Sequence, residues 1–560
     1  MPASPDAVVR YHDGTKHHFQ RFARSLGYLD WASQPSPFRA FAGAPVFPLF
    51  PAPDARSSGY GPRATAFPEL FTSPASSEIT APAVGDLLRH ALGLSAWKAI
   101  RHGADRETRW SLRCNPSSGN LHPTEAYLVC GPLPGLSESP GVYHYAPDRH
   151  ALELRCSIDA QAWRACTGDD VLLVAFTSLH WRESWKYGER AFRYCQHDLG
   201  HAIAALVASA AAVGWSTCLV PEWSQSSLAS LTGIDRDEDF VDAEREEASC
   251  LIAIGPGELT GRIAELPDTL TAAARAGTWF GRASQLSRDH VQWTFIDEVT
   301  EATRDGGRAL RLADARSGQA GAPAAMLTGK RESAQRESIN ARSMFLQRRS
   351  AVAFDGVSSI PRETFLAMLD AVLPHDSAPW SALWWSPRIH LALFVHRVEG
   401  VAPGLYLLPR DQRAVPSLRA SMTRDFLWET EDTLVPLVCL ARGDARRLAA
   451  RLSCDQEIAA DGCFSLGMIA EFDASLHEFG PSFYRHLFWE AGFVGQILYL
   501  EAEAAGVRAT GIGCYYDDPV HDALGLHDHT FQSLYHFTVG TPVEDTRLTT
   551  MPGYSWEREP

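Results

Sequence analysis

Two short segments combine residue types that could move a proton or bind a phosphate. Lys186 and Tyr187 are adjacent, and such a pair can act as general acid and base if burial lowers the pKa of the lysine. A surface lysine beside a core tyrosine is the simpler interpretation. Arg348, Arg349 and Ser350 suit a phosphate dianion, because arginine can donate two charge-assisted hydrogen bonds at once. A solvated basic helix end is the alternative for this second segment.

A third segment, SLRCNPSSGNLHPTEAYLV at residues 111–129, places a polar turn ahead of an apolar strand. The turn supplies hydroxyls, an amide and backbone N–H groups, and its glycine permits close backbone approach. It could bind the edge of a planar polar ring, or it could be an Asx or Ser turn that only redirects the chain. Arg113, just before the turn, could carry charge into the same site. The turn residues are Pro116, Ser117, Ser118, Gly119 and Asn120.

Two further segments carry weaker signals. In YHDGTKHHF, near the start of the chain, His12, Thr15 and Lys16 are potential donors in a place analogous to that of the Arg-Arg-Ser triplet. A polar N-terminal segment explains them equally well. In TGIGCYYDD, Gly511 and Gly513 could bring backbone onto a flat ligand, although a Gly-x-Gly pair alone is not specific.

A histidine-rich stretch, VHDALGLHDHTF, superficially suggests a metal site. Its histidines, His521, His527 and His529, alternate with aspartates. Their spacing fits no common helix-borne metal site, so we predict a polar turn and no bound metal.

These segments must be positioned by a chain that repeats itself. Residues 185–215 and 477–507 align without a gap at an offset of 292 (Gly480 against Gly188, 480 − 188). Each is predicted to form a long apolar helix whose small residues allow a second helix to approach closely. Strand-like segments follow at 249–257 and 533–542. Repeats of this kind predict two homologous halves.

The repeat also predicts the layout of the chain. Residues 141–155 and 404–419 are both expected to form strand, turn, strand. We place the halves at 1–285 and 336–560, joined by a Gly/Ala/Arg-rich linker at 286–335. Helices and strands without regular βαβ alternation predict an α+β fold. Two copies in one chain predict an intrachain pseudo-dimer with sites at the junction, and two independent domains are the alternative.

The halves are not equivalent. At an offset of 292, the Lys-Tyr pair is replaced by Glu478 and Phe479. WWSPRIHLALFV, the expected counterpart of the polar turn and its strand, contains no Pro-Ser-Ser-Gly-Asn. The sequence therefore predicts one specialised site rather than two equal ones.

Composition narrows the class of protein. The 560 residues are 45% hydrophobic and 21% charged, which is ordinary for a globular protein. A net charge of −16 argues against a sequence-independent nucleic-acid binder. The 11 cysteines include no CxxC pair, so we expect reduced thiols in a cytoplasmic protein. No signal peptide is evident, and the Ala-rich run at 202–215 is expected to be a buried helix, not a membrane span.

Taken together, these segments resemble the nitroreductase superfamily. The resemblance rests on the Arg-Arg-Ser triplet, the PSSG turn, the W-K-Y-G-x-R-x-x-R-Y segment that enters a Gly-His helix, and the terminal glycine strand. It is to the SagB/ThcOx-type branch of FMN-dependent dehydrogenases, here as a tandem, two-domain member. It covers nearly the whole chain except the linker, and the PSSG and WKYG segments are its most specific parts.

The resemblance implies an α+β fold with FMN at a subunit interface, each flavin contacting both subunits. In this chain it implies one composite site, with a second pseudo-site near His12, Thr15 and Lys16 that is empty or degenerate. The implied phosphate contacts are Arg348, Arg349 and Ser350, with Arg547 as a further contact. The implied ring contacts are Gly511 and Gly513 from one half, and Pro116, Ser117, Ser118, Gly119 and Asn120 from the other.

The resemblance also implies a reaction. Lys186 or Tyr187 would remove a proton from a small-molecule or peptide-borne, azoline-like substrate while the flavin N5 atom accepts hydride. Two rivals stay open: an NAD(P)H-dependent nitro or quinone reductase, and a non-catalytic scaffold that binds a peptide or partner around a vestigial flavin site. Neither nucleic acid nor membrane is an expected partner, and the pseudo-dimer is compatible with a higher oligomer.

Overall fold

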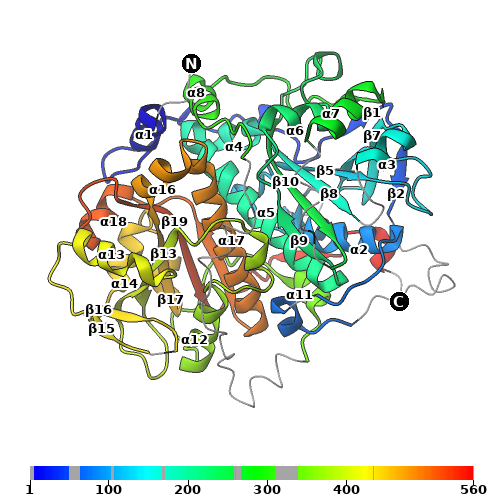
Figure 1. Ribbon diagram of the computed structural model, residues 1–560. Coiled ribbons are helices and arrows are strands. Elements are labelled where there is room, and N and C mark those ends of the chain that lie inside the picture. The colour runs from blue at the N-terminus through cyan, green and yellow to red at the C-terminus, as the bar shows by residue number, and fades with distance from the viewer. Residues whose placement is uncertain are drawn as a thin grey trace.

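Two antiparallel sheets flank two long central helices, α5 (Ala191–Val213) and α17 (Phe483–Ala504), in the described part of the chain (Figure 1). The fold is α+β, as the sequence predicted, with one sheet from each half of the chain. The computed structural model describes residues 5–49, 64–72, 74–102, 106–166, 171–257, 259, 267–308, 338–432 and 434–558.

The two sheets share the same spatial strand order. The first runs β11 (Thr278–Trp279), β7 (Ala151–Ser157), β6 (Gly141–Ala146), β5 (Thr124–Cys130), β8 (Leu172–Ser178), β10 (Glu247–Gly255), β9 (Ser216–Leu219), with β2 (Val46–Pro48) beside β7. The second runs β15 (Glu429–Thr430), β16 (Val438–Arg442), β14 (Gly404–Leu408), β13 (Ile389–Val395), β17 (Phe464–Glu471), β19 (Phe531–Gly540), β18 (Arg508–Ile512). Six successive strands therefore correspond, from β7 to β9 and from β16 to β18.

The remaining elements lie around these layers. The other helices are α1 (Pro5–Gly14), α2 (Ala81–Ala91), α3 (Ala160–Cys166), α4 (His180–Tyr187), α6 (Gln225–Thr232), α7 (Pro267–Ala276), α8 (Thr294–Ala302), α11 (Ala341–Gln347), α12 (Arg362–Ala371), α13 (Val415–Ser421), α14 (Arg446–Leu452), α15 (Ile458–Asp461), α16 (Phe472–Phe479) and α18 (Asp517–Leu524). Smaller sheets pair β1 (Phe41–Ala42) with β12 (Arg282–Ala283), and β20 (Leu548–Met551) with β3 (Leu94–Arg101) and β4 (Glu107–Arg113).

The centre of the molecule is the crossing of α5 and α17. At the crossing point, Gly200 of α5 lies against the backbone of Trp489, and Gly492 of α17 lies against the backbone of His197. A methyl group on either glycine would overlap the backbone oxygen of the facing residue. His197 and Trp489 are themselves related by the offset of 292 (489 − 197), so the crossing is a pseudo-two-fold contact.

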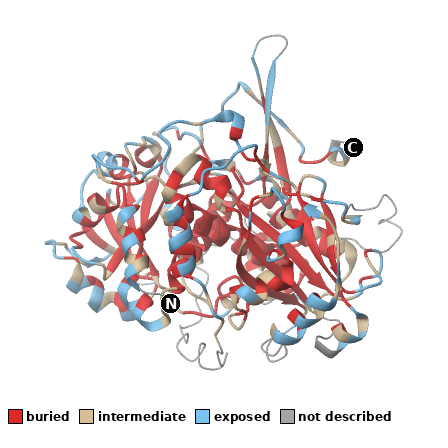
Figure 2. Ribbon diagram, turned by 90° about the horizontal axis from the view of Figure 1, so that it is seen from above, coloured by how far each residue is buried: buried red, intermediate tan, exposed pale blue. Residues whose placement is uncertain are grey.

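The halves share one hydrophobic core. A single cluster of buried residues includes Leu199 and Ile203 from α5 together with Leu487 and Val494 from α17. Figure 2 shows buried residues concentrated in the sheets and in the helices between them. The strands β5 and β13 are buried along their whole length, because each sheet is covered on both faces. The two halves therefore form a pseudo-dimer and not two independent units.

Each half also reaches across to the other. β20, near the end of the described chain, pairs with β3 of the first half. Tyr554 beyond it donates a hydrogen bond to the Pro147 carbonyl and accepts one from the backbone of Leu94. At the other end of the chain, His12 of α1 contacts Tyr484 and Gln532 of the second half. Backbone pairing and buried contacts at both ends thus reinforce the central helix crossing.

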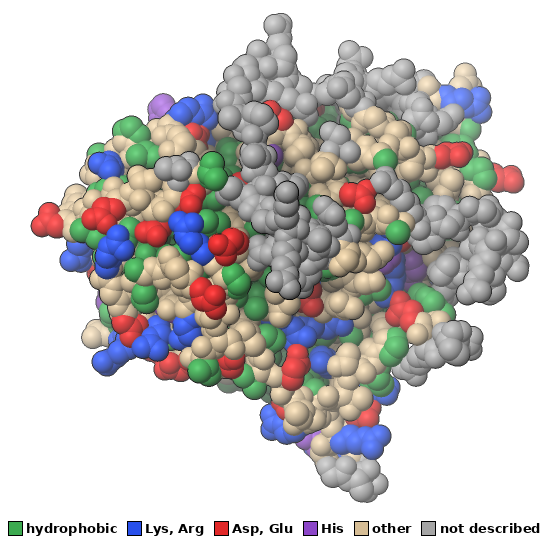
Figure 3. Space-filling view, turned by 90° about the horizontal axis from the view of Figure 1, so that it is seen from below, with side chains coloured by type: hydrophobic (Ala, Val, Ile, Leu, Met, Phe, Trp, Pro, Cys, Tyr) green, Lys and Arg blue, Asp and Glu red, His purple; other side chains and the backbone are tan. Residues whose placement is uncertain are grey.

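The surface is charged without separation by sign on the face seen in Figure 3. Acidic and basic side chains are interspersed there over the described surface, so the net charge of −16 is not gathered into one patch on this face. Among the described residues, no helix has the length and apolar character needed to cross a membrane.

Two segments differ from what the sequence predicted, residues 404–419 and the linker at 286–335. Residues 141–155 form the hairpin of β6 and β7 as predicted, but only the first part of 404–419 is a strand, β14, and the rest enters helix α13. Pro416 lies in the first turn of α13, where its missing N–H is harmless, and β16 takes the strand position. Of the predicted linker, residues 294–302 form α8 against α1, and residues 309–335 lie outside the described part.

The helix crossing generates the first prediction. Gly200→Ala should lower the free energy of unfolding by about 1–3 kcal/mol, because the added methyl group meets backbone that cannot rotate away. The loss should appear even though alanine is the better helix former. Thermal unfolding monitored by circular dichroism measures it. Gly306→Ala is the matched control, since a methyl group there meets nothing within 4 Å; equal melting temperatures for both variants would show that the crossing is not tight.

Candidate cofactor-binding site

A cavity of about 480 Å³ lies where the two halves meet. Its volume falls in the range of about 300–1,000 Å³ that is common for small-molecule and cofactor sites. Residues from both halves line it, including most of those singled out from the sequence. The predicted residues on its wall are Arg113, Pro116, Ser117, Ser118, Gly119, Asn120, Tyr187, Arg348, Arg349, Ser350, Gly511 and Gly513.

The polar turn forms one wall of this cavity. Gly119 and Asn120 both adopt positive φ angles, 59° and 60°, which explains the Gly-Asn pair, since these two residue types tolerate the left-handed region best. Two of its side chains form hydrogen bonds within the protein. The Ser117 hydroxyl accepts the backbone N–H of His122 at 2.7 Å, and the Asn120 amide donates to the Ser111 carbonyl at 2.9 Å. The turn is therefore a rigid wall held by its own hydrogen bonds.

Asp198 on α5 anchors this turn. Its carboxylate accepts the backbone N–H and the hydroxyl of Ser118, each at 2.9 Å. Glu490 holds the matching position on α17 (490 − 198 = 292) and accepts the backbone N–H groups of Arg388 and Ile389, where β13 begins. Each long helix thus uses one buried carboxylate to fix the loop that precedes the central strand of its own sheet.

The two anchors differ in charge. Glu490 pairs with the buried guanidinium of Arg410. Asp198 instead lies beside the buried carboxyl of Glu183, and burial raises the pKa of Asp198 to about 7. Burial, together with the Asp198 carboxylate, raises the pKa of Glu183 well above its ordinary value. The first half therefore keeps a proton on a carboxyl pair directly behind the polar turn.

The opposite end of the cavity is cationic. Arg348, Arg349, Arg508 and Lys98 all line it. Burial, followed by the neighbouring Arg348, lowers the pKa of Arg349 to about 10. Arg348 is 4% exposed, and its Nη1 atom has no hydrogen-bond partner among the described residues. A cluster of crowded cations with an unpartnered buried donor fits an anionic group such as a phosphate.

The triplet is held against the first half of the chain. Arg348 donates from Nε to the Cys114 carbonyl at 2.8 Å, and Arg349 donates to the Ser95 hydroxyl at 3.2 Å. Ser350 shares a 2.8 Å hydrogen bond with the Tyr499 hydroxyl. The triplet, which belongs to the second half of the chain, therefore packs against β3 and the end of β4 in the first half. Neither half forms the predicted phosphate-binding end of the cavity alone.

The Lys-Tyr pair lies at the turn. A methyl group placed on Gly119 would lie 2.7 Å from the Tyr187 hydroxyl and 3.0 Å from Lys186 Nζ, so both side chains reach the turn. Tyr187 lines the cavity, whereas Lys186 is adjacent to it. Burial, followed by the charge of Glu183, raises the pKa of Tyr187 well above its ordinary value. Tyr187 therefore stays protonated at neutral pH and can donate a proton or hydrogen bond, but is a poor base.

Gly511 of β18 and Gly513 in the loop after it both line the cavity, and neighbouring tyrosine side chains explain why these positions are glycine. A methyl group on Gly511 would overlap the Tyr535 hydroxyl, and one on Gly513 would overlap the ring of Tyr194. Glycine is required there because tyrosines from β19 and α5 occupy the space. Gly511 also donates its N–H to the Tyr499 hydroxyl at 3.0 Å.

The prediction that Arg547 contacts the phosphate is wrong, because its side chain lies outside the cavity. Its side chain is 76% exposed and forms a 2.8 Å ion pair with Asp545, two residues earlier in the chain. The cavity wall includes Asp545 and Leu548 but not Arg547. The expected position near the phosphate end is occupied by Arg508 and Lys98 instead, which sequence reasoning did not single out.

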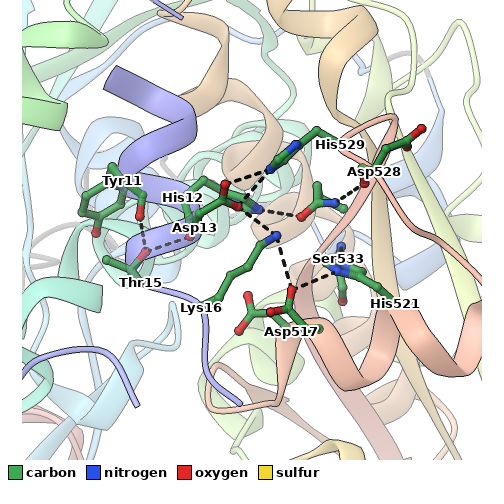
Figure 4. A network of polar contacts seen from close by, with 12 residues as sticks. Tyr11, His12, Asp13, Thr15, Lys16, Asp517, His521, Asp528, His529 and Ser533 are labelled. Atoms are coloured by element: carbon green, nitrogen blue, oxygen red, sulfur yellow. Dashed lines mark hydrogen bonds and ion pairs between the residues drawn. The ribbon is translucent and has the colours of Figure 1, made fainter. Parts of the chain in front are cut away.

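The second pseudo-site has a different character (Figure 4). His12, Lys16, Asp13 and His529 point toward one another there. The buried His12 ring contacts Gln532 at 3.0 Å, and burial, followed by the charge of Arg193, lowers its pKa well below the ordinary value. Lys16 forms a 3.0 Å ion pair with Asp13. Because His12 and Lys16 already have partners within the protein, they are not available as a group to bind a ligand. That the second site is degenerate stays a prediction, and this packing supports it.

Several cavity residues were not anticipated. Asp198, His201, Tyr499 and Tyr535 all lie on its wall. His201 contacts the Tyr535 hydroxyl at 3.1 Å, and burial lowers its pKa to about 3, so it is neutral. Only Asp198 left a usable signal in the sequence, because the repeat aligns it with another acidic residue at an otherwise apolar helix position.

The prediction of a polar turn is correct for only part of the histidine-rich stretch: His521 lies in helix α18, which ends at the left-handed Gly525, and the turn with His527 and His529 follows before β19. His521 accepts the backbone N–H of Ser533 at 2.9 Å, and His529 contacts Asp13 at 2.9 Å. His527 contacts the hydroxyl of Thr423, also at 2.9 Å. The three imidazoles thus have separate partners.

Comparison with known proteins agrees with this architecture. Residues 76–255 match the model of the nitroreductase family. A crystal structure assigned to the nitroreductases, from Anabaena variabilis, superposes with a TM-score of 0.66 at 20% identity, covering 96% of this chain and 99% of that one. A Methanocaldococcus jannaschii protein named among the nitroreductases is 28% identical over 129 residues, 21% of this chain.

The fold of the whole chain is therefore the nitroreductase fold, in a chain that matches the Anabaena protein over nearly its full length. The match to the Methanocaldococcus protein is shorter and spans 63% of that protein, just under two thirds. The family match falls on the half that carries the polar turn and the Lys-Tyr pair.

The Asp198–Glu183 pair generates the second prediction. The folded-state pKa of Asp198, about 7, lies above that of an unfolded aspartate, so its contribution to stability is complete below the unfolded value and is lost as pH rises through about 7. Asp198→Asn keeps an acceptor for Ser118 without a charge. We expect its stability relative to the wild type to increase by about 3 kcal/mol between pH 5 and pH 8, because the difference grows by about 1.4 kcal/mol per pH unit up to the folded-state pKa near 7 and then levels off.

Urea unfolding at the two pH values measures this difference. Parallel pH profiles for Asp198→Asn and the wild type would show that Asp198 is ionised throughout. Asp545→Asn is a suitable control, because that carboxyl is exposed and ion-paired at the surface.

Proposed function

We propose that this chain is an FMN-dependent oxidoreductase with one composite flavin site. The observation that carries the proposal is a cavity lined by both the Arg-Arg-Ser triplet of the second half and the polar turn of the first half. The nitroreductase fold and the family match at 76–255 support it. Both are independent of the arrangement of side chains in the cavity.

The residues fit the group. Arg348, Arg349 and Ser350 would hold the phosphate of FMN, with Arg508 and Lys98 adding positive charge. The polar turn, Gly511 and Gly513 would contact the ring system of FMN. Bound there, FMN would supply an acceptor for a hydride.

Side chains of the protein would accept and donate the protons of the reaction. Lys186 Nζ and the Tyr187 hydroxyl meet at Gly119, and burial raises the pKa of Tyr187 well above its ordinary value. Because Tyr187 stays protonated, Lys186 is the candidate base and Tyr187 the candidate donor. The protonated pair of Asp198 and Glu183 would hold the turn in place while the proton moves.

At a finer level we propose a SagB-type dehydrogenase, a tandem member with domains at 1–285 and 336–560. Its substrate would be a small molecule or a peptide-borne, azoline-like ring that loses a proton to Lys186. The single Lys-Tyr pair and the single PSSG turn support one reaction site per chain. The NAD(P)H-dependent reductase and the non-catalytic scaffold become outcomes of the tests below.

The phosphate end generates the third prediction. Arg348→Ala and Arg349→Ala should each weaken FMN binding by about 10- to 150-fold, the equivalent of losing a hydrogen bond to a charged group. Arg547→Ala should bind FMN as the wild type does, because its side chain lies outside the cavity. Fluorescence titration of flavin-depleted protein measures the three affinities.

Thermal unfolding of the flavin-depleted variants checks that each one is folded. Equal affinity in all three variants would place the phosphate elsewhere. No FMN binding by the wild type would favour the non-catalytic scaffold.

The Lys-Tyr pair generates the fourth prediction. Lys186→Ala should lower turnover of an azoline-containing model peptide by about 10²- to 10⁴-fold, the usual contribution of a positioned proton-transfer group, while flavin absorbance is retained. Lys186→Arg should be similarly impaired, because a guanidinium keeps the charge but cannot accept the proton.

Steady-state kinetics with oxygen as electron acceptor measure both variants. Full activity of Lys186→Arg would show that the site needs a charge and not a base. Rapid anaerobic bleaching of the flavin by NADPH, undiminished in Lys186→Ala, would favour the nitro or quinone reductase.

A further inference from the structure

Two cysteines and a histidine from distant parts of the chain meet beside the cavity. The Sγ atoms of Cys454 and Cys514 lie 2.8 Å apart, and the Nδ1 atom of His17 lies 3.7 Å from the sulfur of Cys514. Cys454 follows α14 and Cys514 follows β18, so sixty residues separate the two thiols in sequence. Their contact is made by the fold and left no spacing pattern in the sequence.

The pair is reachable from the cavity. Cys514 belongs to the cavity wall, directly after Gly513, and both cysteines are partly exposed. Gln456 donates a hydrogen bond to the Cys514 carbonyl at 3.0 Å and fixes the two loops against each other. Seven of the remaining cysteines in the described part are buried. A small reagent can therefore reach this pair more readily than those seven thiols.

The surroundings distinguish the two sulfurs. The Cys454 thiol and the His17 ring lower the pKa of Cys514 to about 5, with Arg190 adding a smaller effect. The shared proton therefore resides on Cys454, whose pKa is raised mainly by its contact with Cys514. A thiolate beside a thiol that can donate to it is the arrangement that makes one cysteine a nucleophile and the other its resolving partner.

The backbone at Cys454 is unusual. Cys454 and Asp455 are consecutive non-glycine residues with positive φ angles, 55° and 57°. Such a conformation costs on the order of 1–3 kcal/mol per residue and persists only where the surrounding contacts impose it. Here it turns the Cys454 side chain toward Cys514, and hydrogen bonds from Arg451 and Tyr516 to Asp455 hold the turn.

We propose that Cys454 and Cys514 form a redox-active dithiol that closes into a reversible disulfide on the wall of the cavity, with a low-molecular-weight disulfide as oxidant. This activity is separate from the proposed flavin chemistry and does not require bound FMN. It would join the loop after α14 to the loop after β18, both of which reach the cavity.

The exchange balances in two steps. The Cys514 thiolate attacks one sulfur of the oxidant, forming a mixed disulfide and releasing one thiolate. Cys454 then gives its proton to that thiolate and attacks the Cys514 sulfur, forming the internal disulfide and releasing the second thiolate. Two cysteine thiols are oxidised, and the oxidant is reduced to two small thiols.

The sulfur geometry favours a disulfide over a bound metal. Two thiolates on one zinc ion stand about 3.8 Å apart, as follows from Zn–S bonds of about 2.3 Å at a tetrahedral angle. The 2.8 Å separation is shorter than that and needs only a small further approach to form a bond. The described residues also offer only His17 as a third ligand in this group.

Titration of the full-length chain with reduced and oxidised glutathione tests the proposal. Peptide mass mapping of the wild type should show a Cys454–Cys514 cross-link that dithiothreitol reverses. In Cys454→Ser the glutathione adduct should accumulate on Cys514, at a level about tenfold or more above that on Cys454 in Cys514→Ser, because only Cys514 is a ready nucleophile. Flavin-depleted protein should give the same result.

The matched control is Cys218→Ser, which removes a third partly exposed cysteine on β9 and should cross-link as the wild type does. Absence of the cross-link at every glutathione ratio would overturn the proposal. Stoichiometric zinc in the purified protein, measured by plasma mass spectrometry and lost in both serine variants, would also overturn it and identify a metal site instead.

Discussion

The close crossing of α5 and α17 is the contact on which the rest of the molecule depends. Gly200 and Gly492 let the two backbones touch, so that α5, which packs against the first sheet, and α17, which packs against the second, share one core. Because the helices lie at the pseudo-two-fold axis, the polar turn anchored on α5 comes to face the Arg-Arg-Ser triplet of the other half. A wider crossing would separate the two walls of the cavity.

The same helices show how a repeated chain can build one site instead of two. Asp198 and Glu490 occupy equivalent positions and fix equivalent loops, but Glu490 is neutralised by Arg410 and Asp198 shares its surroundings with Glu183. The loop held by Glu490 carries tryptophans that fill space, and one of them, Trp385, donates its indole N–H to that carboxylate. The loop held by Asp198 leaves a cavity. The two halves thus keep the same helices and strands but differ in the loops held by Asp198 and Glu490, and this difference explains why only one of these loops borders a cavity.

Much of this arrangement could be predicted from the sequence, because a repeat with a constant offset defines both the pairing of elements and the places where the halves differ. The polar turn, the Arg-Arg-Ser triplet and Tyr187 all reach the cavity. What could not be predicted is which polar groups are already used inside the protein. Asn120, His12 and Arg547 offer suitable donors in sequence, but each already has a partner within the protein. The contact between Cys454 and Cys514 and the charge state of Asp198 depend likewise on tertiary packing.

The number of flavins bound per chain tests the central claim most directly. If the two unequal halves build one composite site, protein reconstituted with excess FMN and freed of unbound cofactor should contain one FMN per chain. Flavin absorbance after denaturation, set against protein determined by amino-acid analysis, measures this ratio. Two FMN per chain would contradict the claim, because the His12 and Lys16 side chains would then have to leave their internal partners to hold a second phosphate.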